Sequence, residues 1–428
     1  MKRIYALLLV LMTSICGAAA ADVPELAGRE AALYCAENGQ VLLDKNMDVP
    51  VHPASITKLM TALLVLESGH DLRETVTVSY DAVHSIERNS THIALDEGEE
   101  VTLEQMMYAM LLTSANDAAN VLAEAVDGTQ EAFAAHMTER AQELGCRHTH
   151  FVNAHGLDDR LHYTTAYDMA VITRALLQYD KFAEISGTQV YEMPATNKQA
   201  EPRQFWNKQN ILNPQSKFYD KTAIAGKNGY TSQAGHTLVT VARRDGVTLI
   251  AVTMGSVESK YDKHRDTVAM FAYGYDQFEK ATLSAADVAA AAKQAGLSPD
   301  EGAIAPAMVL LPKGKSTVDL QFTAQENALC IACGADRLLT LEVPEQPADA
   351  AVFAEETLTA AERAVKQPAE RANGLPKAVW YAGAVVLALL LAFLTLLAYR
   401  TARIRRQRKQ IREMRMRARR QRDSEFHE

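Results

Sequence analysis

The chain has 428 residues, of which 48% are hydrophobic and 23% charged; these ordinary globular values exclude a disordered chain, a collagen-like chain and a coiled coil. Five cysteines are too few for a disulfide scaffold, and at ~150 residues per domain the length allows two or three domains. The net charge of −9 is uneven. Residues 400–428 contain twelve Arg or Lys against four Asp or Glu, and Lys2 and Arg3 add two positive charges, which leaves residues 22–399 with −19. A body this acidic argues against nucleic-acid binding, which depends on neutralising phosphates.

The N-terminal segment has the pattern of a secretory signal peptide. Lys2 and Arg3 precede an apolar run from Ile4 to about Met12, and small residues follow through Ala21. A positive start, a short apolar stretch and an Ala-x-Ala end are the three parts of such a signal. The sequence therefore predicts a signal peptide over residues 1–21, with cleavage after Ala21 or the alanine before it.

A second hydrophobic segment lies near the C-terminus. Residues 378–399 contain no charged side chain and, at about 1.5 Å per residue, are long enough to cross a hydrocarbon layer of ~30 Å. Trp380, Tyr381 and Tyr399 lie near its ends, where aromatic rings prefer the membrane interface. The positive-inside rule places the basic tail, residues 400–428, in the cytoplasm and the acidic body outside. We therefore expect a single-pass protein of the cell membrane.

Hydrophobic periodicity in the body predicts strands at both ends and helices between them. Two short strands are predicted over residues 29–44, around the turn Asn38-Gly39. Helices are predicted over residues 55–66, 103–112, 117–126, 131–144 and 165–178, and a β-hairpin over residues 236–254. This order indicates an α/β (α+β) fold in which helices cover an antiparallel sheet.

The composition changes near residue 282. Alternating patterns such as 317–322 and 338–343 predict a small, mostly β domain over residues 283–350. Residues 351–377 are rich in Ala, Glu and Pro, and we expect them to form a stalk before the membrane segment. The main domain is accordingly placed at residues 22–282.

The pair Ser55 and Lys58 has the spacing of a nucleophile and its base. The two residues lie one turn apart at the start of a predicted helix, so they share a face. Free backbone N–H groups and the helix dipole at that end suit an anionic acyl-transfer transition state. The lysine can accept the hydroxyl proton if burial lowers its pKa. On its own, the pattern equally describes an N-cap serine followed by a surface lysine.

Two further motifs follow in a suggestive order. Ser114 and Asn116 lie in the break between two predicted helices, where a hydroxyl can relay protons and an amide can hold a peptide backbone. Lys227-Asn228-Gly229 precedes the predicted hairpin, so that the lysine can attract a carboxylate and the glycine admits an extended substrate. Each motif alone describes a helix break or a turn. Together with the first pair they form the three-part arrangement of serine penicillin-binding proteins and serine β-lactamases.

Four segments carry a resemblance to a known family: residues 53–62 (PASITKLMTA), 112–119 (LTSANDAA), 151–157 (FVNAHGL) and 229–235 (GYTSQAG). They are similar to the D-alanyl-D-alanine carboxypeptidases, low-molecular-mass penicillin-binding proteins, of the membrane-anchored type found in Firmicutes. The resemblance covers about residues 29–278. It implies a β-lactamase/transpeptidase-like antiparallel sheet flanked by helices, followed by a small β-rich domain and a single C-terminal transmembrane helix.

The resemblance also implies a role for each motif residue. Ser55 would attack the carbonyl between two D-alanines, Lys58 would act as general base and Ser114 would shuttle protons to the leaving amine. Asn116 would hold the substrate backbone and Lys227 would orient the terminal carboxylate. The backbone N–H groups of Ser55 and Tyr230 would form the oxyanion hole. The implied partners are peptidoglycan stem peptides ending in D-Ala-D-Ala and β-lactams as covalent inhibitors, with no metal or cofactor.

One position departs from the family pattern, which usually has Lys-Thr-Gly. Here Asn228 stands between Lys227 and Gly229, and its amide is longer and planar where a threonine hydroxyl normally contacts the substrate carboxylate. We expect retained acyl-enzyme chemistry with altered carboxylate binding. The open alternatives are a D,D-endopeptidase, a β-lactamase of the same fold, and a catalytically weakened peptidoglycan-binding protein.

Two clusters give weaker patterns. Cys146, His148, His150 and His155 lie close enough in sequence to suggest a metal site, although the resembling family has this loop and needs no metal. The pair Cys330 and Cys333 resembles a redox motif without the surrounding βαβ unit. We therefore expect a structural loop in the first case and a local disulfide or two free thiols in the second.

Overall fold

The computed structural model describes residues 23–87 and 89–344. Its main element is an antiparallel sheet of five strands in the order β2-β1-β9-β8-β7. The strands are β1 (Glu30–Cys35), β2 (Val41–Lys45), β7 (Ala223–Thr231), β8 (Gly235–Arg244) and β9 (Val247–Ser256). The strands predicted at the two ends of the body therefore form one sheet, in which β1 pairs with β9 and Leu33 lies opposite Ala251.

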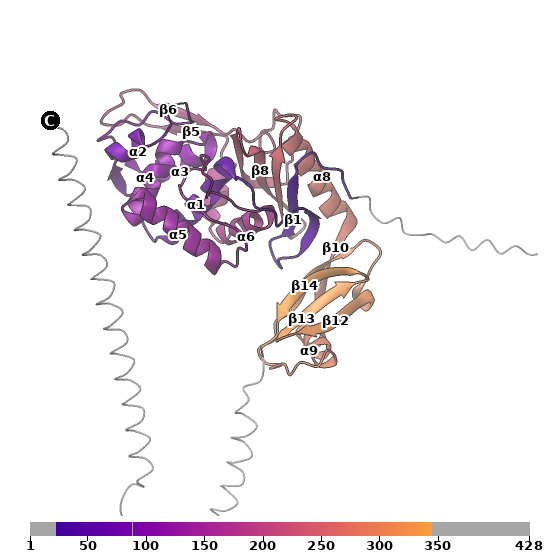
Figure 1. The fold of residues 1–428 in the computed structure, drawn as a ribbon. Coiled ribbons are helices and arrows are strands. Elements are labelled where there is room, and N and C mark those ends of the chain that lie inside the picture. Colours follow the sequence, from indigo (N-terminus) through magenta and orange to yellow (C-terminus); the bar gives the residue numbers. More distant parts are fainter. Residues whose placement is uncertain (1–22, 88, 345–428) are drawn as a thin grey trace, which may run out of the picture. The chain divides into compact units, whose positions relative to one another are not determined.

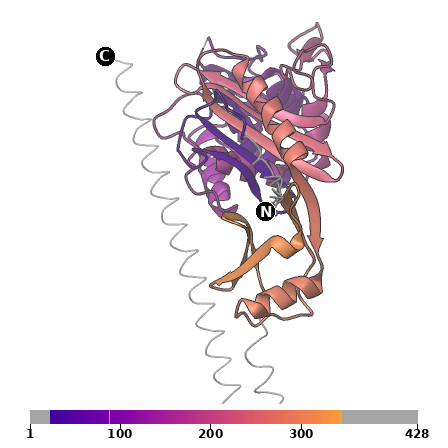
Figure 2. The same ribbon diagram turned by 90° about the vertical axis from the view of Figure 1, so that its right-hand side faces the viewer.

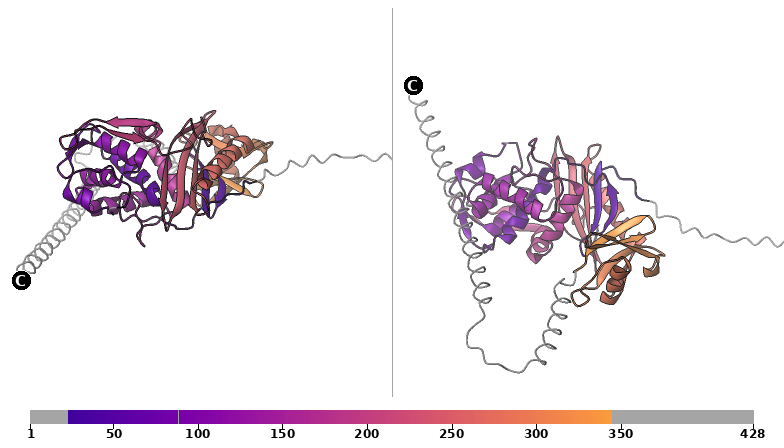
Figure 3. Two further views of the ribbon diagram at one scale, coloured as in Figure 1. Left: turned by 90° about the horizontal axis from the view of Figure 1, so that it is seen from above. Right: turned by 60° about the horizontal axis from the view of Figure 1, so that its bottom comes forward.

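Helices cover both faces of this sheet, and the central strand β9 is buried along its whole length. On one face, α6 (Ala166–Leu176) packs against β1 and β9; on the other, α8 (Asp262–Gln277) packs against β8 and β9. Figure 1 and the left view of Figure 3 show the sheet between these helices. Successive residues of β1 point to opposite faces, so Ala32 and Tyr34 join the core beside α6, while Leu33 joins the core beside α8.

A helical region packs on the α6 side of the sheet and shares one apolar core with it. Its helices are α1 (Lys58–Glu67), α2 (Tyr80–His84), α3 (Leu103–Tyr108), α4 (Asn116–Asp127), α5 (Gln130–Glu143) and α7 (Asp180–Gly187). A 3-10 turn, η1 (Ala54–Thr57), precedes α1, and a π-helical turn, η2 (Ala109–Thr113), follows α3. Two short hairpins complete the region: β3 (Thr75–Thr77) with β4 (Glu100–Thr102), and β5 (Val190–Met193) with β6 (Arg203–Trp206). The helices predicted from periodicity are confirmed, with two differences: residues 55–57 form the 3-10 turn η1, and the end of the predicted helix 103–112 is the π-helical turn η2. The predicted break lies at Ser114 and Ala115, between η2 and α4.

Residues 278–344 contain most of the remaining strands and have an apolar cluster of their own. The elements are β10 (Phe278–Leu283), α9 (Ala285–Gln294), β11 (Ala307–Pro312), η3 (Thr317–Asp319), β12 (Leu320–Gln325), β13 (Ala328–Cys333) and β14 (Asp336–Glu342). Figure 2 shows α9 beside these strands. The strand predicted to begin at Thr317 begins at Leu320, because Ser316 and Asp319 form a capping box around a 3-10 turn. The predicted limits of this domain, 283–350, stay a prediction.

Hydrogen bonds tie β11 to the turn that precedes β2. The buried side chain of Gln40 donates to the backbone oxygen of Leu310 at 2.7 Å and accepts from its backbone nitrogen at 2.9 Å. Asn38 donates to the backbone oxygen of Met308 at 3.0 Å. The glutamine amide thus takes the place of a neighbouring strand, and it links the β-rich part to the large sheet.

The pair Cys330 and Cys333 consists of two free thiols. Both residues lie on β13, and residues three apart on a strand point to opposite faces of the sheet. The sequence left open a local disulfide or two free thiols, and the structure shows the two free thiols.

Several predicted segments lie outside the described residues: the signal peptide 1–21, the stalk 351–377, the transmembrane segment 378–399 and the basic tail 400–428. These stay predictions. Within residues 23–87 and 89–344, no helix is both long enough and apolar enough to cross a bilayer.

Candidate active site

Ser55 lies in the short turn η1, directly before α1. No side chain caps this turn, so the Ser55 hydroxyl is not used as a helix cap. The preceding residue, Ala54, has a φ of 52°, a left-handed conformation that is uncommon outside glycine. Thr57 Oγ1 donates to the backbone oxygen of Ala54 at 2.9 Å and accepts from His162 Nε2 at 2.9 Å. These bonds hold the unusual turn that carries the candidate nucleophile.

Lys58 is completely buried and directed at the Ser55 hydroxyl. Its Nζ donates to Ser55 Oγ at 3.1 Å, to Asn116 Oδ1 at 2.7 Å and to the backbone oxygen of His155 at 2.6 Å. Burial lowers the pKa of Lys58 to about 7, against the charge of Asp117, which raises it. A lysine with this pKa is partly neutral at pH 7, so it can accept a proton from the serine.

Ser114 faces a second buried lysine. It follows the π-helical turn η2 and has a φ of 69°, again left-handed, as strained residues at functional sites often are. Lys227, on β7, donates from Nζ to Ser114 Oγ at 3.0 Å and to the backbone oxygen of Asn228 at 2.7 Å. Burial lowers the pKa of Lys227 well below its ordinary value, and the charge of Lys58 acts in the same direction.

Strand β7 runs against the turn that carries Ser55. A Cβ atom on Gly229 would lie 2.7 Å from the backbone nitrogen of Ser55 and 2.5 Å from Thr237 Oγ1, so only glycine permits this approach. The next residue, Tyr230, is 61% exposed, and its ring centroid lies 4.4 Å from that of His236. Asn228 is half-buried, with Oδ1 at a long 3.5 Å from Lys227 Nζ.

A cavity of about 580 Å³ opens beside these groups. Five of the predicted site residues line it: Ser55, Ser114, Asn228, Gly229 and Tyr230. The other three, Lys58, Asn116 and Lys227, do not line the cavity and are buried. Each lysine donates to one of the serines, and Asn116 accepts from Lys58. The structure therefore brings all eight together. Further lining residues were not foreseen from the sequence: Thr91, Lys208, Asn210, His236, Lys260, Tyr261, Lys263 and His264.

Lys263 stands out among the unforeseen residues. Its side chain is buried, and among the described residues its Nζ forms hydrogen bonds only with the backbone oxygens of Gly229 and Thr237, each at a long 3.4 Å. Burial lowers the pKa of Lys263 to about 8. Within the part of the chain that the structure describes, no carboxylate forms a salt bridge with it. With Lys208 and Lys260 on the same cavity, this lysine favours an anionic ligand.

The residues of the predicted structural loop have separate partners. Cys146 Sγ contacts the backbone oxygen of Asp168, His150 Nδ1 contacts that of Leu161, and the backbone oxygen of His155 accepts from Lys58 Nζ. Among the residues that the structure describes, no group of three or more His, Cys, Asp or Glu has the arrangement of a metal site.

Comparison with known sequences gives the same family throughout. The family model described as D-alanyl-D-alanine carboxypeptidase (peptidase S11) matches residues 17–258. D-alanyl-D-alanine carboxypeptidase DacF of Bacillus subtilis is 32% identical over 259 residues, which are 59% of this chain and 63% of that protein. DacA of Escherichia coli is 30% identical over 300 residues, which are 65% of this chain and 70% of that protein. The chain thus spans about two thirds of the length of these relatives.

Solved structures of the same kind share the fold. The Streptomyces K15 DD-transpeptidase is 26% identical, with a TM-score of 0.55, and the match covers 59% of this chain and 98% of that one. The D-alanyl-D-alanine carboxypeptidase of Mycobacterium tuberculosis is 28% identical, with a TM-score of 0.54, and the match covers 60% of this chain and 95% of that one. Since the family model spans more than half of the sequence and includes all three motifs, the chain belongs to the D-alanyl-D-alanine carboxypeptidase family.

Proposed function

We propose that this protein is a serine-type D-Ala-D-Ala carboxypeptidase that removes the terminal D-alanine from peptidoglycan stem peptides. One observation supports the proposal most. Two serine hydroxyls face one cavity, and each is hydrogen-bonded to a buried lysine: Ser55 to Lys58 at 3.1 Å and Ser114 to Lys227 at 3.0 Å. Such paired groups suit acyl transfer, which needs an activated nucleophile and a route for the proton to the leaving amine.

In the acylation step, Ser55 Oγ attacks the carbonyl carbon between the two D-alanines and Lys58 takes its proton. The backbone N–H groups of Ser55 and Tyr230 stabilise the developing oxyanion. Ser114, held by Lys227, passes a proton to the leaving nitrogen as the C–N bond breaks, and the proton that Lys58 took from Ser55 replaces it. Water then attacks the Ser55 ester: its oxygen joins the acyl carbon, one of its protons returns to Ser55 Oγ, and the shortened peptide leaves as a carboxylic acid. Apart from the substrate and water, every group in this scheme belongs to the chain.

The terminal carboxylate of the substrate is proposed to bind among the cavity lysines. Lys227 is buried and engaged with Ser114, whereas Lys263, Lys208 and Lys260 line the cavity. A buried cation whose only contacts are two long bonds to carbonyls gains most from an incoming carboxylate. We assign the main charge contact to Lys263, and we expect Asn228 to add a weaker amide contact.

Asn228 favours a second candidate, a catalytically weakened peptidoglycan-binding protein. Its amide stands where the family pattern has a threonine hydroxyl, so the affinity for a free carboxylate is expected to differ. A variant with Asn228→Thr separates the two cases. A sharply higher peptidase turnover indicates altered substrate binding in a working enzyme, and unchanged turnover removes Asn228 as a cause of weakening. Cleavage of cross-links or of penicillin instead of the terminal residue would identify an endopeptidase or a β-lactamase.

We further propose that the protein is exported and anchored in the cell membrane. The signal pattern of residues 1–21, the uncharged segment 378–399 and the basic tail 400–428 support an extracellular catalytic domain. Residues 22–282 would form that domain, and residues 283–350 with the stalk 351–377 would separate it from the bilayer. Added protease should digest the body in intact protoplasts and leave the tail protected.

The decisive experiment uses the full-length protein, purified in detergent and incubated with benzylpenicillin. Intact-protein mass spectrometry with peptide mapping is expected to find one covalent adduct, on Ser55, and none in the Ser55→Ala variant. A pentapeptide ending in D-Ala-D-Ala is expected to release D-alanine. Absence of both the adduct and the released D-alanine would exclude a serine peptidase and favour a binding role.

A further inference from the structure

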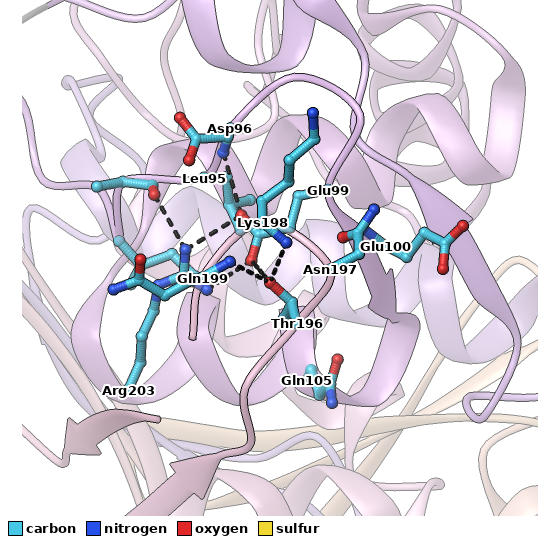
Figure 4. Close-up of polar contacts among 12 residues, drawn as sticks. Leu95, Asp96, Glu99, Glu100, Gln105, Thr196, Asn197, Lys198, Gln199 and Arg203 are labelled. Carbon is cyan, nitrogen blue, oxygen red and sulfur yellow. Dashed lines mark hydrogen bonds and ion pairs between the residues drawn. The ribbon is translucent and has the colours of Figure 1, made fainter. Parts of the chain in front are cut away.

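A buried ion pair lies away from the catalytic groups. Glu99 precedes β4, and its side chain is fully buried; Arg203 begins β6 and is 12% exposed. Arg203 donates to both carboxylate oxygens of Glu99, at 2.6 and 3.1 Å, and Thr196 donates to one of them at 2.7 Å. Figure 4 shows these side chains converging on the carboxylate. Among the described residues, no other ion pair is as deeply buried on both sides.

The pair holds a segment that reaches the cavity at Thr91. Arg203 also donates to the backbone oxygen of Ala94 at 3.1 Å, and Glu99 accepts from the backbone nitrogen of Asp96. A few residues earlier, Thr91 lines the cavity, and its backbone oxygen accepts from the backbone nitrogen of Asn116 at 2.8 Å. The segment 91–99 is therefore fastened at one end to the active-site helix α4 and at the other to β6.

The chain that follows β6 forms a second wall of the cavity. Five residues after Arg203, Lys208 lines the cavity, and its Nζ donates to the backbone oxygen of Thr113 at 2.8 Å. Asn207 fixes this part of the chain through bonds to the backbone oxygens of Ser186 and Thr188. Thr91 and Lys208 thus lie on segments that approach Ser114 and its neighbours. The buried ion pair links these segments directly, together with hydrogen bonds from Thr196 to Glu99 and from Asn197 to the backbone oxygen of Gly98.

We propose that Glu99 and Arg203 are a positioning pair that fixes the separation of the Thr91 and Lys208 walls and thereby sets the affinity for extended peptides. The inference rests on the proposed function. Walls that are already in place bind a flexible peptide at a smaller entropic cost than walls that must be ordered. The bonds from Lys58 to Ser55 and from Lys227 to Ser114 do not pass through the pair. Loss of the pair should therefore raise KM far more than it lowers kcat.

The test compares variants of the full-length protein in which one or both partners are neutralised. Arg203→Met is expected to raise the KM for a D-Ala-D-Ala pentapeptide at least tenfold, with kcat within threefold of wild type. Arg203→Lys keeps the charge but cannot reach both Glu99 and Ala94, so we expect an intermediate KM. The double variant Glu99→Gln with Arg203→Met leaves no unpaired buried charge and keeps the test valid if the single variant folds poorly.

A matched control exists in another Arg–Glu pair. Arg140 donates to both carboxylate oxygens of Glu67, at 2.8 and 2.9 Å, between α5 and α1, and neither residue lines the cavity. Arg140→Met should change stability without changing KM. Active-site titration with penicillin counts the folded sites, so kcat is given per folded site, and KM does not depend on their number. An Arg203→Met or double variant with wild-type KM overturns the proposal.

Hydrogen exchange provides a readout that does not depend on turnover. Amides in residues 91–99 and 207–210 should exchange at least tenfold faster in Arg203→Met than in wild type or in Arg140→Met. Unchanged exchange in both segments overturns the proposal. If the wild-type protein neither releases D-alanine nor binds penicillin, the proposed function fails, and the exchange comparison alone decides whether the pair holds the walls.

Discussion

Substitution of Gly156 by alanine tests how Ser55, the proposed nucleophile, is held in place. Gly156 has a φ of 88°, and an added Cβ would lie 1.9 Å from the backbone oxygen of Ala54 and 2.8 Å from Thr57 Oγ1. Non-bonded carbon–oxygen contacts below 3.0 Å are essentially never seen, so the Ala54 carbonyl must move by roughly 1 Å, and Ser55 moves with it. A displacement of that size costs about 10²-fold in rate. We expect Gly156→Ala to lower the rate constant of penicillin acylation by about this factor.

The matched control is Gly145→Ala. Gly145 has a φ of 84°, and nothing lies within 4 Å of its added Cβ, so the control introduces the same backbone strain without the collision. Left-handed strain costs about 1–2 kcal/mol and lowers Tm by roughly 2–4 °C per kcal/mol in a domain of this size. We expect that fall in Gly145→Ala with an unchanged acylation rate, measured by stopped-flow and by thermal melting. Equal acylation rates in the two variants would refute the reasoning.

Three further predictions concern pH, the β-rich part and the thiols. The acylation rate constant should rise with pH and level off above about 7, because burial lowers the pKa of Lys58 to about 7 and only the neutral amine accepts the proton; a flat profile from pH 5 to 9 contradicts this role. Gln40→Ala should cost about 2 kcal/mol in urea unfolding, since both backbone groups of Leu310 lose their partner. Burial raises the pKa of Cys35 to about 12, so this buried thiol should react with Ellman's reagent only after unfolding.

The local features of the fold and of the site could be predicted from the sequence. Asn38-Gly39 indicates the first hairpin, and in the turn between β1 and β2 Gly39 has the left-handed conformation, with a φ of 81°. Ser55 and Lys58 lie one turn apart, so the helical spacing alone brings them together. The contact between Ser114 and Lys227 joins residues 113 positions apart. No periodicity indicates such a contact, and only the order of the three motifs suggested it.

The unforeseen parts depend on tertiary contacts. Helix α8 presents a mixed pattern in sequence, yet it covers the second face of the sheet because Gly274 lets it approach; a Cβ there would lie 2.6 Å from Leu249 and 2.8 Å from Leu33. Lys263, near the start of α8, resembles an ordinary surface lysine until that packing buries it. The bond between Glu99 and Arg203 spans 104 positions and likewise leaves no local pattern.

The site departs from local conformational rules at both of its serines. Ser114 is itself left-handed, and Ser55 directly follows the left-handed Ala54; neither strained residue is a glycine. Each such residue costs about 1–2 kcal/mol, and the burial of Lys58 and Lys227 adds a desolvation cost. Local sequence preference alone would relax both turns and withdraw the hydroxyls from the lysines. The surrounding core has to supply the difference, and the buried residues of helices α1, α4 and α6, which surround the segments of Ser55 and Ser114, belong to that core.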